Sequence, residues 1–171
     1  MFDFIPYDQP PPEQGNDIGF SVPNPGYAEQ LARYREALKL NPFIDDHVCE
    51  SLEPRLTDSP ERLIAADEIC VATAEATLVV GYPFTGQYAA TIAASTPAGF
   101  TRADLFRQIA RVYAAMYEGA TLAVAERVHN KCVESPRFGT AWHALEDLVV
   151  EEAVVETRSD GRVFVWIYLG S

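Results

Sequence analysis

The stretch "LVVEEAVVETRSDGRVFVWIYL", residues 148–169, decides the fold, because it predicts a β-hairpin with an unusually apolar second strand. Asp160-Gly161 is a strong two-residue turn signal, and β-branched and aromatic residues flank it. Successive side chains of a strand point to opposite faces of a sheet. One face of the second strand carries Phe164, Trp166 and Tyr168, and the other carries Val163, Val165, Ile167 and Leu169. We therefore expect both sides of this strand to be covered.

A second hairpin is predicted within residues 75–95. Two strand-like runs flank Thr85-Gly86 there, and a two-residue turn at this point would pair Val80 with Thr91. The two predicted hairpins are separated along the chain by one long helical pattern. Strands grouped in this way indicate an α+β fold.

The helical pattern covers residues 101–118, "TRADLFRQIARVYAAMYE". Thr101 and Asp104 resemble the start of a capping box. Apolar residues recur at helical spacing along one side, which should lie on the sheet. This apolar stripe consists of Leu105, Ile109, Val112 and Met116.

The N-terminal third is different in character. Residues 1–24 are rich in proline and in apolar side chains, and they predict an extended arm that lies along its own domain or a neighbour's. Residues 25–40 predict a helix, and residues 60–69 predict a short one. We thus expect an arm and one α+β domain, residues 25–171. The domain would hold a mainly antiparallel sheet of about four strands in two hairpins, packed by one long amphipathic helix, with N-terminal helices beside it.

The composition excludes several kinds of partner. The formal net charge is −12, with 25 acidic residues against 13 lysines and arginines. Phosphate backbones and anionic lipids repel such a chain, so we expect neither nucleic acid nor membrane as a partner. Three cysteines without a CxxC pattern indicate reduced thiols. With no signal-peptide features at the N-terminus, we expect a cytoplasmic or nuclear protein.

The most suggestive polar pair is His143 with Asp147, four residues apart. On a helix they would share one face, where they could bind a metal or act as an acid–base pair. Alternatively His143 is structural and donates to a backbone carbonyl or to Asp147. We favour the structural role and expect a buried ring, no metal and no cofactor. A metal site would need a further ligand from His129, His47 or Glu151.

Three segments together carry a family resemblance: "YPFTGQY" (82–88), "GFTRADLFRQIARVYAAMYE" (99–118) and "RFGTAWHALEDLVVE" (137–151). They resemble an uncharacterised protein family of plants, other eukaryotes and large DNA viruses. The likeness covers residues 77–155 and departs from the family pattern at Ala141-Trp142, where the family places tryptophan one residue earlier. It implies segment boundaries and is compatible with a viral source, but it implies no activity.

Two functions follow as alternatives. The leading one is a non-catalytic intracellular interaction or structural protein that forms a homo-oligomer or binds a protein partner. It rests on the expectation that either the aromatic row of the last strand or the Phe2–Tyr7 arm needs a second surface, and an arm that crosses to a neighbour would bury both. The alternative is an enzyme, for example a hydrolase, with His143 and Asp147 at its centre. An enzyme would need an open pocket around His143.

Overall fold

The computed structural model describes residues 1–41, 48–122 and 133–171, and its centre is a six-stranded mixed β-sheet. The predicted sheet of about four mainly antiparallel strands is therefore wrong. Two further strands come from the N-terminal segment, and the two hairpins join through a parallel pair, β6 with β13. From edge to edge the sheet consists of β1 (Ile5–Pro6), β7 (Tyr88–Ala93), β6 (Glu75–Val80), β13 (Val163–Gly170), β12 (Val149–Thr157) and β2 (Asn16–Gly19).

Smaller sheets surround this one in the described part of the chain. Their strands are two or three residues long, too short for an alternating pattern to reveal them in the sequence. These strands are β3 (Val22–Pro23) with β4 (Ser51–Leu52), β5 (Ile69–Val71) with β8 (Phe100–Thr101), and β10 (Val133–Ser135) between β9 (Thr121–Leu122) and β11 (Gly139–Ala141).

The C-terminal hairpin forms where the sequence predicts it. Thr157 pairs with Val163, and the Arg158 N–H donates to the Arg162 carbonyl oxygen at 2.9 Å. This register leaves a three-residue loop, residues 159–161, with Gly161 at a φ of 83°. A type I turn followed by a left-handed glycine is the usual form of such a loop. The turn places two arginines opposite each other.

The first hairpin, in contrast, is longer at its turn than predicted. Val80 pairs with Tyr88, and Thr91 pairs with Thr77. Residues 81–87 form an extended loop whose Phe84 N–H donates to the Gly81 carbonyl oxygen at 3.0 Å. The predicted pairing of Val80 with Thr91 is therefore wrong by three residues. Pro83 cannot donate to a strand ladder, and strand pairing accordingly ends before it.

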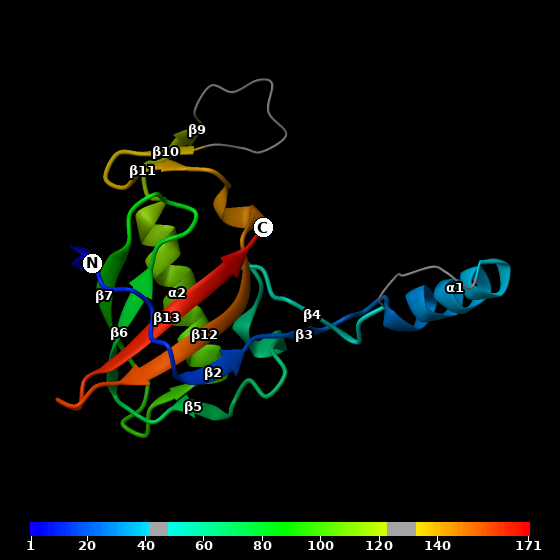
Figure 1. Cartoon of the computed structure of the whole chain (residues 1–171), viewed down its shortest axis with the longest axis horizontal. Helices are drawn as coiled ribbons and strands as arrows, with labels where there is room; N and C mark the ends of the chain where they lie inside the picture. Colours follow the sequence, from blue (N-terminus) through cyan, green and yellow to red (C-terminus); the bar gives the residue numbers. More distant parts are fainter. Residues whose placement is uncertain (42–47, 123–132) are drawn as a thin grey trace.

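Helix α2 (Arg102–Met116) covers one face of the sheet, which we call the helix face (Figure 1). Thr101 caps it, since its hydroxyl accepts the Asp104 N–H at 3.1 Å. The predicted stripe is confirmed, because all four of its side chains are fully buried in one cluster with the sheet. The paired tyrosines further along α2 donate to loop carbonyls: Tyr113 to Tyr82 at 3.0 Å, and Tyr117 to His143 at 2.7 Å.

The predicted N-terminal helices do not cover the sheet. Helix α1 (Tyr27–Leu40) forms, but it extends away from the sheet and none of its residues is buried (Figure 1). The predicted helix at 60–69 is only a single 3₁₀ turn, η1 (Pro60–Arg62), and Ile69 begins β5. Among the described residues, neither α-helix is long and apolar enough to cross a bilayer.

The opposite face of the sheet is crossed by the N-terminal segment itself. Residues 7–15, which we call the strap, connect β1 at one edge with β2 at the other edge. Five strand spacings of about 4.8 Å make a crossing of about 24 Å. The ten Cα-to-Cα steps from Pro6 in β1 to Asn16 in β2 reach about 33 Å when the chain is fully extended. The strap must therefore be largely extended, a conformation that its prolines favour. Figure 1 shows the strap in front of the sheet, with α2 behind it.

The strap packs on the aromatic row of the last strand, on what we call the strap face. The Tyr7 ring lies 5.5 Å from that of Trp166, edge to face, and 6.0 Å from that of Phe164. Val79 and Val154 complete this second apolar cluster. Phe164 and Trp166 are thereby buried by the same chain, whereas Tyr168, the third member of the aromatic row, stays 37% exposed. The prediction that both faces of β13 are covered is confirmed for its central residues, and a second copy is not needed to bury Phe164 and Trp166.

Candidate functional site

His143 and Asp147 do not share a helix face. His143 lies between β11 and a single 3₁₀ turn, η2 (Leu145–Asp147), so the spacing of four residues has no helical meaning here. The His143 ring is half-buried, and its Nε2 atom lies 3.2 Å from the Ser171 hydroxyl. The prediction of a buried ring bonded to a backbone group or carboxylate is therefore wrong.

The surroundings of His143 are a small hydrogen-bonded group at the end of the sheet. The Ser171 hydroxyl also lies 2.9 Å from the Tyr82 hydroxyl, whose ring centroid is 5.8 Å from that of His143. Among the described residues, no carboxylate is hydrogen-bonded to the His143 ring. A base that activates a hydroxyl needs a partner to orient it, and the part of the chain that the structure describes provides no carboxylate partner for this ring.

A metal centre at His143 is not assembled by the described residues either. In residues 1–41, 48–122 and 133–171, no three side chains of histidine, cysteine, aspartate or glutamate are grouped closely enough to hold an ion. Two of the predicted further ligands, His129 and His47, lie outside the described residues.

Burial affects the two α2 tyrosines near this group. Desolvation raises the pKa of Tyr113 and of Tyr117 well above the usual tyrosine range. Both hydroxyls therefore stay protonated at neutral pH and donate hydrogen bonds to main-chain carbonyls. Their role is to tie α2 to the loops at 82 and 143.

An open pocket lies elsewhere, on the strap face, and we call it the strap pocket. Its volume is about 550 Å³, within the range of small-molecule sites. The N-terminal residues form one wall, β6 and β7 form the floor, and the turn between β12 and β13 closes one end. The lining residues are Met1, Phe2, Asp3, Ile5, Tyr7, Gln9, Thr77, Ala89, Ala90, Thr91, Arg158, Arg162 and Phe164.

Two arginines from the C-terminal turn project over the floor of the strap pocket. The guanidinium carbon of Arg158 lies 3.7 Å from the centroid of the Phe164 ring, and that of Arg162 lies 5.6 Å from it. A guanidinium over an aromatic face is attracted by the ring quadrupole. Phe164 thus holds both cations, which we call the arginine pair, at one end of the pocket.

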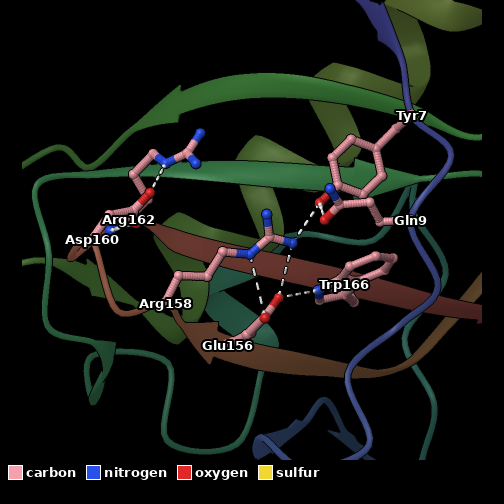
Figure 2. Close-up of polar contacts among 7 residues, drawn as sticks. All are labelled: Tyr7, Gln9, Glu156, Arg158, Asp160, Arg162 and Trp166. Carbon is pink, nitrogen blue, oxygen red and sulfur yellow. Dashed lines mark hydrogen bonds and ion pairs between the residues drawn. The ribbon is translucent and has the colours of Figure 1, made fainter.

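Arg158 is held in place from two sides. Its Nε and Nη2 atoms donate to the two Glu156 carboxylate oxygens, each at 3.3 Å, and Nη2 also donates to the Tyr7 hydroxyl at 2.6 Å (Figure 2). Glu156 in turn accepts the Trp166 indole N–H at 3.4 Å. The Tyr7 hydroxyl in turn donates a hydrogen bond to the Gln9 side-chain oxygen at 3.2 Å. This network ties the strap to the C-terminal hairpin.

Arg162 is held by its neighbour in the turn. Its Nε atom donates to an Asp160 carboxylate oxygen at 2.7 Å, and its backbone N–H donates to the other oxygen at 3.0 Å. The backbone N–H and the guanidinium of Arg162 lower the pKa of Asp160 below its ordinary range. At Arg158, desolvation lowers the pKa, but the hydrogen bonds to Glu156 and Tyr7 outweigh it and raise that pKa overall.

Several terminal N–H groups of the arginine pair remain without a protein partner among the described residues. They are those on Nη1 of Arg158 and on both terminal nitrogens of Arg162. Figure 2 shows these nitrogens on the sides of the guanidinium groups that are turned away from Glu156 and Asp160. A guanidinium has five N–H donors, so each arginine is positioned by some of them while others stay available to a ligand.

The sequence-based predictions do not include this site, because Asp160-Gly161 indicates only a turn and the alternating residues of the last strand indicate only its apolar faces. The available signal was the pair of arginines on either side of the turn, next to an aromatic strand. The contribution of Tyr7 had no local signal, because it comes from the other end of the chain.

Comparisons of the chain with protein-family models, with curated proteins and with solved structures find no match. The family resemblance of residues 77–155 accordingly stays a prediction.

Proposed function

We propose that this chain is a non-catalytic binding protein and that the strap pocket is its recognition site. The observation that carries the proposal is the arginine pair, positioned by its own carboxylates and by Tyr7 but with N–H donors left for a ligand. Besides the two arginines, the polar side chains that line the pocket are those of Asp3, Tyr7, Gln9, Thr77 and Thr91, and no histidine or cysteine is among its described lining residues. Such a lining suits recognition better than acid–base or nucleophilic chemistry.

The alternative of an enzyme centred on His143 and Asp147 has weaker support. The two side chains are not bonded to each other in the described structure, and the His143 ring has only the Ser171 hydroxyl as a hydrogen-bond partner. The enzyme hypothesis therefore serves as the competing outcome of the test.

The two tryptophans allow one experiment to separate the two sites. Trp166 is bonded to Glu156 beside the strap pocket, whereas Trp142 is exposed and adjacent to His143. We would titrate a library of small anionic, cationic and neutral fragments into ¹⁵N-labelled protein and follow both indole N–H signals. Binding at the strap pocket should move the Trp166 signal and leave the Trp142 signal in place. Fragments that move only Trp142 would favour the site at His143 and overturn the proposal.

The proposed function includes a cellular compartment, the cytoplasm or nucleus, and binding to a protein partner or to a second copy of the chain. Cys49 and Cys70 are both free thiols in the structure, which supports a reducing compartment such as the cytoplasm or nucleus. We also propose that the chain binds a protein partner or forms a homo-oligomer. Light scattering on the purified full-length chain tests self-assembly, and a monomer at high micromolar concentration would reject it.

A further inference from the structure

We propose that the strap pocket binds a small monocarboxylate with an apolar body, the carboxylate being held by the arginine pair. This inference rests on the proposed function, because it names the ligand class of that same site. Three features of the pocket support it, namely the available donors, the local charge and the apolar lining.

The available donors favour an anionic oxygen group. Among the described residues, Arg158 donates through Nε and Nη2 to protein acceptors, and the Arg162 guanidinium donates through Nε alone. The terminal nitrogens that remain belong to two guanidinium groups over the same ring. Planar guanidinium donors match the two oxygens of a carboxylate and form short, charge-assisted hydrogen bonds with them.

The local charge favours a single negative charge over two. Glu156 and Asp160 balance the two arginines, Asp3 also lines the pocket, and the whole chain carries a formal charge of −12. A dianion such as a phosphate monoester would therefore gain no net attraction from the surrounding charges, and the negative charge of the whole chain would repel it. A monocarboxylate needs only the directed N–H groups, and it experiences half of that repulsion.

The remaining lining favours an apolar body on the ligand. Away from the arginine pair, the pocket is bounded by Phe2 and Ile5 from the N-terminal segment and by Ala89 and Ala90 from β7. Ile5 is 60% exposed, which is unusual for an isoleucine unless it meets another surface. Burial of apolar ligand surface against these side chains supplies the affinity, while the arginine pair fixes the orientation.

The test uses 2-naphthoate as the probe and the full-length chain as the receptor. Two matched compounds vary only the head group: 2-naphthamide is neutral, and 2-naphthyl phosphate is a dianion. Binding is followed through the Trp166 indole signal, with Trp142 as the internal reference. We expect 2-naphthoate to bind about tenfold or more tightly than 2-naphthamide, since hydrogen bonds to charged groups are the stronger kind. We also expect it to bind more tightly than the phosphate.

A pair of variants tests the role of the arginine pair directly. Arg162→Gln removes the charge at a side chain that is 65% exposed, so the fold should be retained, which the unchanged Trp166 signal of the free variant would verify. We expect 2-naphthoate to bind this variant about tenfold more weakly. Arg107→Gln is the matched control, because Arg107 is also partly exposed and paired with a carboxylate, Glu61, but lies outside the strap pocket. It should leave the affinity unchanged.

The possible failures point to different conclusions. If the amide binds as tightly as the carboxylate and moves Trp166, the ligand class is wrong but the strap pocket remains a binding site. If the phosphate binds most tightly, the assignment of a monocarboxylate is overturned in the same way. If none of the three moves Trp166 at low millimolar concentration, the inference is overturned. The proposed function itself fails only if the broader fragment series also leaves Trp166 unmoved.

Discussion

On the helix face of the sheet, α2 lays a row of side chains against the strands, and its central residues are fully buried. On the strap face, a single extended segment crosses the strands and carries one aromatic ring, Tyr7, onto them. A helix satisfies its own backbone hydrogen bonds and offers a broad apolar stripe. The strap offers one line of side chains, and its first N–H, that of Tyr7, is bonded to the Gln87 carbonyl oxygen at 2.9 Å. The helix therefore closes its face, whereas the strap leaves the strap pocket beside it.

The difference predicts that stability depends mainly on the helix face, and Ile109→Ala tests this most severely. Ile109 is fully buried at the centre of the apolar stripe, and emptying such a position costs about 2–5 kcal/mol of unfolding free energy. Urea denaturation followed by circular dichroism gives the measurement. On the outer side of the same helix, Arg107→Ala should cost clearly less than Ile109→Ala, because its closer ion pair, with Glu61 at 2.9 Å, is exposed, and its pair with the buried Asp104 is longer, at 3.6 Å. A loss below about 0.5 kcal/mol for Ile109→Ala would contradict the assigned packing.

The strap face should respond more weakly, and two glycines provide a matched pair. A Cβ at Gly15 would lie 3.0 Å from the Val155 carbonyl oxygen and closer still to a methyl group of Val154, whereas a Cβ at Gly19 would meet nothing within 4 Å. Gly15→Ala should therefore push the end of the strap off the sheet and cost about 1–3 kcal/mol, the usual range for overpacking. Gly19→Ala should stay within about 0.5 kcal/mol.

The same pair can show whether the strap moves as a unit. In a Trp142→Phe background, the fluorescence reports Trp166, which is 3% exposed under Tyr7. Gly15→Ala should shift its emission to longer wavelength as water reaches the indole, and Gly19→Ala should not. Equal stability losses for the two variants would mean that the strap does not press on β12 as the structure indicates.

Local patterns predicted the elements that rest on local physics. The spacing of Leu105 and Ile109 is a property of one helix, and the alternation around Trp166 is a property of one strand. Both were confirmed. The parallel pairing of β6 with β13 joins segments far apart in the chain, and no repeat or turn in the sequence encodes it.

The edge strands show a second reason why the prediction was incomplete. Pro6 ends β1, and a proline argues against a strand unless that strand lies at an edge. The prolines of the strap correctly predicted extended backbone, but not the surface on which it lies. The position of the strap could be predicted only from a known strand order, because the strap connects the two outer strands of the sheet.

The candidate site likewise combines residues whose proximity follows from local sequence with residues that only the folded chain brings together. Arg158 and Arg162 flank a recognisable turn, so their proximity follows from the sequence once the turn type is known. Tyr7 binds Arg158 across a separation of 151 residues, and only the folded chain reveals that contact. His143 and Asp147 misled the analysis because the spacing of four residues matters only on a helix, and this segment ends in a single 3₁₀ turn.

The smallest expected effect comes from Asp160, at the rim of the strap pocket. Its folded-state pKa is lowered by the backbone N–H and the guanidinium of Arg162, so ionised Asp160 stabilises the folded chain. A depressed pKa gives a contribution that is present above the unfolded-state pKa and is lost as the pH falls through the folded-state pKa. On the helix face the sign is opposite: burial raises the pKa of Tyr113, so that contribution is lost only as the pH rises through alkaline values.

Asp160→Asn tests this difference between the faces. Asparagine can still accept the Arg162 backbone N–H in the turn, but it has no charge to attract the guanidinium. The variant should melt slightly below the unmodified chain at neutral pH, and the gap should close as the pH falls below the ordinary aspartate range. In an Arg162→Gln background the gap at neutral pH should be smaller, because the Arg162 guanidinium no longer lowers the pKa of Asp160. A gap that widens on acidification would show that Asp160 is not the stabilising carboxylate of this turn, and the strap face would then have no acid-sensitive contact at Arg162.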